Sequence, residues 1–586
     1  MSQGSQPPKH TAAAAADRGS ASAGTDAASA QPSNPALPYG QDGHPRRWAI
    51  LGVLVVSLLI VVLDNTILNI ALPTIQRDLG ASQSQLVWAV DSYVLVFAAL
   101  LFTWGVLGDR FGRKRILVIG MLIFGIGSTM CSFATSPGML IGFRALMGIG
   151  GAAVTPVTLA IITVVFAPHE RGKAIGAWAA SVGGAVALGP VLGGLLLQHP
   201  SSFNWLTNND WGGVFLVNIP IVIIGLIGIF MVVPETKNPN AAELDFLGLA
   251  ISVVGLVALV YGIIHASETL SWTSLTVLGP ITAGVVIIIG FVLYERQSTH
   301  KSFDVTLFTN RGYAVSLTAV SLAFFAMSGI TFSLPFYLQI LRGYDTLAAG
   351  LCFLPFAFGQ LLAAPRSAGM VVRFGYKRVM TFGLTLVAIA LLALTQLRID
   401  TPIWLIIIIF FAFGFGMGNV IAPASTVMQN TLPLDRAGAG SAVQNTVRQV
   451  FGALGVAIIG TMLATRYAST VVPALDRLPV QVPQAAKDAA ANSVIATNSV
   501  LNTAVTSGLS KQIADSVRAQ AFDGFLTATH VTNLVCAIIV AIAAIVVVTL
   551  LPVIKPPQRQ VDSTAGVGSA SSGDSAPATA VAAAAH

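Results

Sequence analysis

Two ionisable residues lie deep inside apolar stretches of the chain, where such groups are rare. Asp64 lies in the stretch LDNTILNIALP at residues 63–73, near the middle of the first expected helix. Charged groups are costly in hydrocarbon and usually mark function, and low dielectric disfavours the carboxylate form. Asp64 can therefore be protonated in one conformation and charged in another, where it attracts an organic cation or pairs with an arginine. The alternative is a structural acid tied to a neighbouring helix.

Arg144 is the second of these residues and lies in LIGFRALMGIGGAA, residues 140–153. Arg144 and Asp64 lie about six and about eight residues inside their expected helix ends, a similar depth at about 1.5 Å per residue. We predict that Arg144 faces Asp64 and stabilises its charged form, so that protonation breaks the pair and biases the conformation. The alternative is that Arg144 has only a structural role and holds neighbouring helix backbones in place. Phe411 and roughly Met327 take the matching places in the second half, so this chemistry is expected to be asymmetric.

A glycine-containing loop, GVLGDRFGRKR at residues 105–115, joins two expected helices. Its glycines permit a tight turn, and Asp109 can sit near a helix N-terminus, where the dipole favours an anion. Its arginines can pair with Glu170, giving a latch that forms when the inner side closes. An orientation signal alone would explain the cations but not the glycines or Asp109. The residues assigned to this gating loop are Gly105, Asp109, Arg110, Gly112, Arg113 and Glu170.

The segment GGAVALGPVLGG at residues 183–194 combines small residues with a proline. Small residues let neighbouring membrane helices pack closely, and a proline removes a backbone hydrogen bond and permits a kink. Both properties suit a moving gate. The residues assigned to this motif are Gly184, Gly189, Pro190, Gly193 and Gly194.

Substrate contacts are predicted among polar and aromatic residues that would face a central cavity. Aromatic faces bind organic cations, and loosely packed aromatic walls suit promiscuous binding. Each of these residues could equally serve ordinary packing. Arg366 and Arg448 are further cations that could admit anions. The candidates are Asn65, Asn69, Trp88, Asp91, Tyr93, Phe332, Phe336, Tyr337, Gln339, Gln360 and Asn419.

Composition indicates that lipid surrounds the elements that carry these residues. Of 586 residues, 54% are hydrophobic and 9% charged, against about 25% charged in soluble proteins. The net charge of +7 does not form one basic patch, because the cations recur in short runs between apolar segments, so nucleic acid is not expected as a partner. Fourteen apolar windows are long enough to span a bilayer. They lie near 47–72, 84–107, 115–135, 138–166, 172–198, 212–233, 245–266, 274–295, 312–341, 346–371, 378–397, 402–430, 437–466 and 528–553.

The distribution of Lys and Arg predicts the orientation. Most cations fall in the alternate loops that lie inside if the N-terminus is cytoplasmic, whereas the short loops on the other side hold only Arg77, Arg342 and Arg398. This asymmetry places both termini in the cytoplasm. The loop 467–527 also carries cations, but long loops cross regardless of charge. We expect short amphipathic helices there, which either cap the outer face or are an addition without a role in transport.

An internal repeat divides the spans into two six-helix halves. GVLGDRFGRKRI at 105–116 and AGMVVRFGYKRV at 368–379 share RFG-x-KR, and the pairs PHER/PLDR and ALP/SLP recur at nearly the same offset. Related bundles rocking about a central site are common in secondary transporters. The expected organisation is a disordered cytoplasmic tail at 1–45, a bundle at 46–233, two inserted helices at 245–295, a second bundle at 312–553 and a disordered tail at 554–586.

The four motifs together resemble the major facilitator superfamily, and specifically its fourteen-helix drug–proton antiporters of the EmrB/QacA type. In that family, GxLxDRxGRxx, RxxxGxGxA, GxxxGPxxGG and LDxTIxNxALP are signatures, and all four stand here with few substitutions. The resemblance implies a major facilitator fold. It also implies that Asp64 and Arg144 serve proton coupling, that Asp109 and Arg113 gate, and that the helix with Pro190 is typical of exporters.

Enzymatic readings are disfavoured. No GxxxxGK[ST] loop or HExxH motif occurs, and Cys131, Cys352 and Cys536 lack metal-ligand spacing. The predicted function is multidrug efflux by a monomeric, proton-coupled antiporter of a bacterial cell membrane, without cofactor or metal, which exports hydrophobic, often cationic, small molecules. The alternatives are a narrow exporter of one endogenous metabolite or lipid, and a non-transporting sensor or scaffold, for which Asp64 would have no use.

Overall fold

The structure is a computed structural model that describes residues 43–237, 245–298, 305–430, 437–478, 483–506 and 509–554. In these ranges the regular elements are all helices. The reason is physical, because a backbone in hydrocarbon must satisfy its own polar groups and a helix does so within one segment. The expected tails, apart from residues 43–45 and 554, and the PLDR repeat at 433–436 lie outside the described residues.

The N-terminal half is built from long helices joined by short turns. The helix that begins at Gln83 is capped by Ser82. The Ser82 side chain accepts a hydrogen bond from the backbone N–H of Gln85, and the Gln85 side chain accepts one from the backbone N–H of Ser82. Three short helices precede the last long one, and the third of them runs into it as part of one candidate span, Gly213–Val232. The elements are α1 (Arg47–Leu79), α2 (Gln83–Phe111), α3 (Arg113–Ser132), α4 (Pro137–Val165), α5 (Pro168–Gln198), η1 (Pro200–Ser202), α6 (Asn204–Thr207), α7 (Gly213–Leu216) and α8 (Asn218–Val232).

The rest of the chain holds the inserted pair, the second half and a helical extension. Two predicted spans are broken: 312–341 ends in a π-helical turn, and 346–371 is interrupted at Cys352 and Phe353. The elements are α9 (Phe246–Thr269), α10 (Leu275–Gln297), η2 (Val305–Thr309), α11 (Arg311–Phe336), η3 (Tyr337–Leu341), α12 (Thr346–Leu351), α13 (Leu354–Phe374), α14 (Tyr376–Leu394), α15 (Ile403–Asn430), α16 (Ala437–Asp476), α17 (Gln484–Asn492), α18 (Val494–Thr506) and α19 (Lys511–Leu550).

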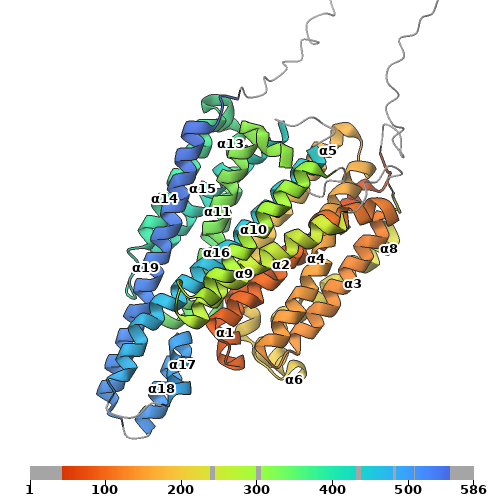
Figure 1. The fold of residues 1–586 in the computed structure, drawn as a ribbon. Coiled ribbons are helices and arrows are strands. Elements are labelled where there is room, and N and C mark those ends of the chain that lie inside the picture. Colours follow the sequence, from red (N-terminus) through yellow and green to blue (C-terminus); the bar gives the residue numbers. More distant parts are fainter. Residues whose placement is uncertain are drawn as a thin grey trace, which may run out of the picture.

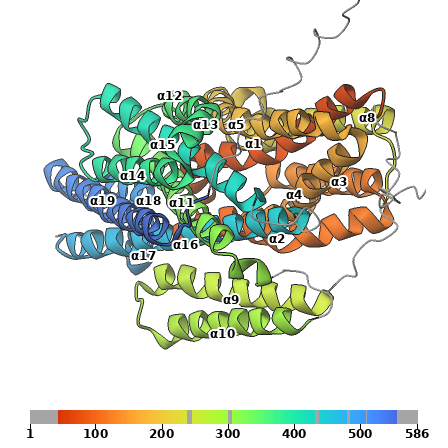
Figure 2. The ribbon, with the colours of Figure 1, turned by 90° about the horizontal axis from the view of Figure 1, so that it is seen from above.

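The predicted all-α polytopic architecture is confirmed. Thirteen candidate spans in the described residues are long and apolar enough to cross a membrane. The remaining predicted span, 172–198, corresponds to α5, whose apolar portion is Gly184–Gln198. The helices group into two bundles, with α1–α5 and α8 on one side and α11–α16 and α19 on the other (Figure 2). The inserted pair α9 and α10 lies outside both, with α9 packed against α2 and α16 and α10 against α9 (Figures 1 and 2).

Three predicted boundaries are wrong for one reason. The helix α1 continues past Pro73 until Gly80 ends it in the left-handed conformation (φ 62°), α16 continues to Asp476, and α19 already begins at Lys511. Hydropathy detects the part of a helix that lies in hydrocarbon, whereas the hydrogen-bonded helix continues into water wherever its residues allow. Much of the expected loop 467–527 is therefore an extension of two spanning helices.

The middle of that segment forms the two short helices α17 and α18, as predicted. They stand beside the ends of α16 and α19 in Figure 1. The Tyr467 and Thr497 hydroxyls lie 2.7 Å apart, and Arg518 of α19 donates to Asn498 and Asn502 of α18 at 3.1 and 3.0 Å. The hairpin also touches α1. It is thus anchored mainly on the C-terminal half.

The repeated RFG-x-KR motif encodes the same turn in both halves. Gly112 separates α2 from α3 at φ 116°, and Gly375 separates α13 from α14 at φ 81°. Side chains disfavour such positive φ values, so glycine is required at both places. The shared backbone geometry supports the internal repeat.

Candidate functional site

A buried ion pair joins α1 to α4 in the N-terminal bundle. The guanidinium of Arg144 donates to the carboxylate of Asp64 through Nη1, and its Nε donates to the Ala89 carbonyl at 3.1 Å. The same guanidinium lies 4.4 Å above the ring centroid of Tyr93. Arg144 is fully buried and Asp64 is 2% exposed. The two side chains meet as the equal-depth argument predicts.

Sequence reasoning missed the second partner of Asp64. Asn218, at the start of α8, donates from Nδ2 to Asp64 Oδ1 at 3.0 Å and to Ser128 Oγ at 3.0 Å. Ser128 in turn donates to the carbonyl of Phe215 at 2.8 Å. A signal existed, because Asn218 is a lone amide at the head of the apolar run VNIPIVIIGLIGIF. The carboxylate is therefore held by α4 and α8 together.

This arrangement stabilises a buried carboxylate, which can take up a proton only after a structural change. A buried carboxylate is tolerated because a cation and hydrogen bonds compensate it, and removing one partner would leave a charge uncompensated. With Asp64 nearly inaccessible in this conformation, a proton can reach it only when the surrounding helices open a water path. The site is thus chemically suited to couple protonation to conformation.

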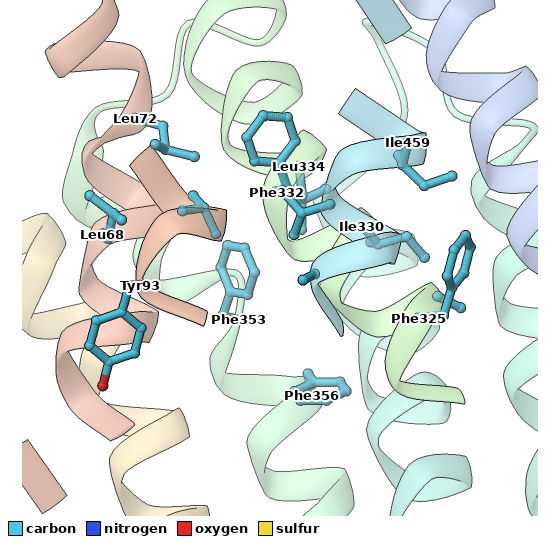
Figure 3. Packing of buried hydrophobic residues seen from close by; sticks show 14 of the residues in the cluster. Leu68, Leu72, Tyr93, Phe325, Ile330, Phe332, Leu334, Phe353, Phe356 and Ile459 are labelled. Carbon is cyan, nitrogen blue, oxygen red and sulfur yellow. The ribbon is translucent and has the colours of Figure 1, made fainter. Parts of the chain in front are cut away.

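The two halves meet on the side away from residues 43 and 554. Two described hydrogen bonds cross between them: Gln339 Nε2 donates to the Ile70 carbonyl at 2.9 Å, and Thr346 Oγ1 to the Gly194 carbonyl at 3.0 Å. Figure 3 shows the apolar packing near this boundary, with Leu68, Leu72 and Tyr93 from one half and Phe332, Phe353 and Phe356 from the other. These contacts define a conformation closed on that side.

The glycine motif of α5 lies at these close approaches. A Cβ on Gly189 would meet the Thr66 side chain, with Thr66 Cβ 2.7 Å away, and one on Gly193 would lie 3.2 Å from Ile67 Cγ2. A Cβ on Gly194 would lie 2.7 Å from the Cα of Leu347, in the other half. Gly184, in contrast, has no atom within 4 Å of the corresponding position. The motif therefore permits contact with α1 and with α12 at once.

The predicted gating loop is tied within the N-terminal half. Arg113, 8% exposed, donates to Asp109 Oδ1 at 2.9 Å through Nε and 2.8 Å through Nη2. Its backbone N–H donates to the carbonyl of Thr236, just beyond α8, at 2.9 Å. Gly105 approaches Pro156 of α4, with 3.5 Å between an added Cβ and the proline Cβ. Arg110 lies 5.9 Å from the ring centroid of the adjacent Phe111.

The predicted latch between the loop arginines and Glu170 belongs to a conformation closed on the inner side, and it stays a prediction. In the present conformation Glu170 accepts from Arg47 Nε of α1 at 2.5 Å, and another acid, Glu235, contacts the loop. Glu235 accepts from the backbone N–H of Lys114 at 3.1 Å and lies 3.6 Å from Arg115 Nε. Here Glu170 lies in the first turn of α5 beside the start of α1, whereas the loop folds against the end of α8.

Replacing Gly112 with alanine should destabilise the loop more than the same change at Gly375. An alanine Cβ at Gly112 would lie 2.5 Å from Glu235 Oε1, so this carboxylate would have to move away from the Lys114 N–H that it accepts from, in addition to the cost of φ 116°; Gly375 has no atom within 4 Å. We expect Gly375→Ala to incur only the backbone strain, about 1–3 kcal/mol, and Gly112→Ala to exceed it. Thermal unfolding midpoints of both variants in detergent measure the difference; equal losses would mean that the Glu235 contact is unimportant.

The predicted substrate contacts fall into different surroundings. Asn65 Oδ1 accepts from Arg144 at 3.5 Å, and Asn69 Nδ2 donates to the Asn65 carbonyl at 3.0 Å. Asp91 is fully buried, and neither of its carboxylate oxygens has a hydrogen-bond partner among the described residues. Trp88 is half-buried. On the N-terminal side, Asn65, Asn69 and Tyr93 thus lie at or next to the ion pair.

In the C-terminal half most candidates pack inside the bundle. Phe336 lies 5.9 Å from Phe332 between ring centroids, the Tyr337 hydroxyl donates to the Arg398 carbonyl at 2.7 Å, and Asn419 donates to the carbonyl of Phe415 at 2.9 Å. Gln360 is half-buried. Substrate contact stays a prediction for all of them. Of the two further cations, Arg448 stacks over Phe324 at 4.8 Å and Arg366 donates to the Leu362 carbonyl at 3.2 Å.

The geometry defines a class of protein. A helical membrane protein with two related halves, closed against each other on one side and holding a buried ion pair, has the architecture of a secondary transporter. The Major Facilitator Superfamily model matches residues 54–456. The chain belongs to that superfamily and is a multi-pass membrane transporter.

Individual relatives agree with the resemblance noted in the sequence. The chain is 35% identical over 439 residues to the puromycin resistance protein pur8 of Streptomyces alboniger, covering 74% of this chain and 85% of that one. It is 33% identical over 503 residues to the multidrug efflux pump LfrA of Mycolicibacterium smegmatis, covering 86% and 96%. A solved bacterial homologue of the human lysosomal transporter Spinster shares the fold, with a TM-score of 0.59 at 16% identity and coverage of 86% and 96%.

Proposed function

We propose that this protein is a proton-coupled antiporter that exports hydrophobic, often cationic, small molecules across the bacterial cytoplasmic membrane. The observation that carries the proposal is the ion pair between Asp64 and Arg144, buried at membrane depth. Protonation of Asp64 removes its charge and releases Arg144, so each protonation state favours a different packing of α1 against α4. A proton entering down its gradient then drives the change.

Alternating access supplies the rest of the cycle. Both termini lie in the cytoplasm in this proposal, so the closed side described above is the outer side. Opening it requires separation of Gln339 from Ile70 and of Thr346 from Gly194. Each proton supplies about 2.3 kcal/mol per 100 mV of membrane potential, which sustains a gradient of well over tenfold for an uncharged substrate. For a monovalent cation exchanged against one proton the potential cancels, and the pH gradient drives export with about 1.4 kcal/mol per pH unit.

The gating loop regulates the inner side in the same cycle. Asp109 and Arg113 form a pair within the loop, and Glu235 holds its backbone to the end of α8. These contacts keep α2, α3 and α8 together as one rigid unit. The unit can then move as a whole when the two halves rock.

The breadth of the substrate range is open between two proposals. The multidrug pump LfrA supports broad export, and the charged, aromatic surroundings of Asp64 suit organic cations. The relative pur8, named for resistance to puromycin alone, supports a narrow exporter of one compound. Competition separates the two, because a narrow exporter ignores most dyes whereas a broad one is inhibited by several.

Transport into proteoliposomes with an imposed pH gradient tests the proposal. With the purified full chain and ethidium, a lipophilic cationic dye, we expect accumulation inside vesicles whose interior is acidic. Accumulation should collapse when a protonophore dissipates the gradient. Dye that equilibrates at the same rate with and without the gradient would show a uniport, and coupling to protons would be refuted. Unlabelled drugs of other classes, added as competitors, give the breadth.

A further inference from the structure

Asn218 is a buried residue whose side-chain nitrogen has two hydrogen-bond partners and whose side-chain oxygen has none among the described residues. It is fully buried where α8 begins. Its nitrogen contacts Asp64 Oδ1 and Ser128 Oγ, each at 3.0 Å. Its Oδ1 is also buried and has no hydrogen-bond partner among the described residues. Buried amide oxygens are normally paired, so this open acceptor requires an explanation.

The orientation of the amide follows from its neighbours. The carbonyl of Phe215 can only accept, so the hydroxyl of Ser128 must donate its single hydrogen there, at 2.8 Å. Ser128 Oγ then has only lone pairs left for Asn218. The group facing both Ser128 and the carboxylate of Asp64 is therefore the NH2, which uses its two hydrogens on them. This arrangement matches a charged Asp64.

Protonation of Asp64 on Oδ1, the oxygen that Arg144 does not contact, reverses what Asn218 has to supply. The O–H at Oδ1 is a donor and needs an acceptor, which an NH2 group cannot supply. A half-turn of the Asn218 amide brings the unpaired Oδ1 to that position. Its two lone pairs can accept from Asp64 and from Ser128, whose hydroxyl hydrogen then leaves the Phe215 carbonyl.

We propose that Asn218 is a positioning residue for proton exchange, whose amide donates to the charged Asp64 and turns to accept from the protonated acid. This inference rests on the proposed function and adds to it a second helix, α8, that responds to protonation. The other titratable groups that interact with Asp64 are Arg144 from α4, Tyr93 from α2 and Cys131 from α3. Of these, Arg144 carries a charge. No titratable side chain from the described parts of α5, α7, α8, α11 and α12 takes part in the hydrogen bonds or ion pairs of Asp64.

The test follows protonation directly, by infrared titration of the purified full chain in lipid. The carboxylic-acid C=O band that disappears in Asp64→Asn belongs to Asp64, and its pH midpoint is measured in the wild type and variants. Hydrogen bonds to a charged group are stronger than those to a neutral one. Asn218→Leu should therefore move the midpoint upward by about one pH unit. Asn218→Ser, which keeps a hydroxyl able to donate and accept, should restore part of the difference.

Ser128→Ala provides a second variant that leaves Asn218 in place. It releases the amide from its fixed orientation, so a smaller upward shift is expected and the band should broaden. Unchanged midpoints in both Asn218→Leu and Ser128→Ala, with only thermal stability reduced, would make Asn218 a packing residue and overturn this inference. A wild-type band that does not titrate at all would instead refute the proposed proton coupling itself. The two failures are therefore distinct.

Discussion

Proton-driven accumulation of ethidium is expected to fall to the level of empty vesicles when Asp64 is replaced by asparagine. The amide cannot take up or release a proton near neutral pH, so the proton gradient can no longer drive the conformational change. Folding should persist with reduced thermal stability, because the variant resembles the protonated acid of the proposed cycle, and Arg144 keeps its bond to the Ala89 carbonyl although its charge loses its partner. Transport in proteoliposomes with an acidic interior measures the loss, and gel filtration with thermal unfolding confirms the fold.

Two controls make this result specific. Asp64→Glu retains a titratable acid and should keep a reduced but gradient-dependent rate. Dye exchange at zero pH gradient should survive in Asp64→Asn, because the halves can still rock without a proton. Undiminished, pH-dependent accumulation in Asp64→Asn would remove this residue from the mechanism.

The second large effect is predicted at the boundary between the halves. Leucine at Gly194 would place its Cβ 2.7 Å from the Cα of Leu347 and against the carbonyl of Thr346, so α5 and α12 could no longer close. Overpacking at a rigid contact costs about 1–3 kcal/mol, which shifts a two-state equilibrium by roughly 5–150-fold. We expect the closed-outer conformation to be depleted and transport to fall by about tenfold or more.

Gly184→Leu is the matched control, since it lies on the same helix with no atom within 4 Å of the added Cβ. Both variants should fold, but only Gly194→Leu should increase labelling of a cysteine placed at Asn69 by a membrane-impermeant reagent from outside. The buried Cys131, Cys352 and Cys536 are removed from the background. Equal labelling and equal transport in the two variants would show that the Gly194 contact does not control access.

Prediction from the sequence was most successful where the argument depended on one segment at a time. The apolar windows located the spanning helices, since each helix satisfies its own backbone. The facing of Asp64 and Arg144 followed from residue counts, because the rise per residue converts sequence distance into depth. The repeated RFG-x-KR motif agrees with the equivalent turns that the structure shows at Gly112 and Gly375, since positive φ leaves few residues to choose from.

Sequence reasoning could not decide which helix faces meet. It found Glu170 from its charge, but it missed Glu235, which lies just beyond the helix on which the loop 105–115 packs. Substrate contact stays a prediction for Gln339 and Tyr337. In this conformation Gln339 donates to the Ile70 carbonyl of the other half, and the Tyr337 hydroxyl donates to the Arg398 carbonyl.

The sequence by itself determined that this chain is a helical membrane protein in two related halves, and that one acid and one arginine lie at equal depth within it. These properties are local, because they follow from composition, helix rise and turn chemistry. Only the tertiary structure decided that Asn218, 154 residues from Asp64, completes the site and that Gly194 closes against Leu347. Such contacts depend on the rotation and crossing of whole helices, which packing between distant segments sets and no short stretch of sequence encodes.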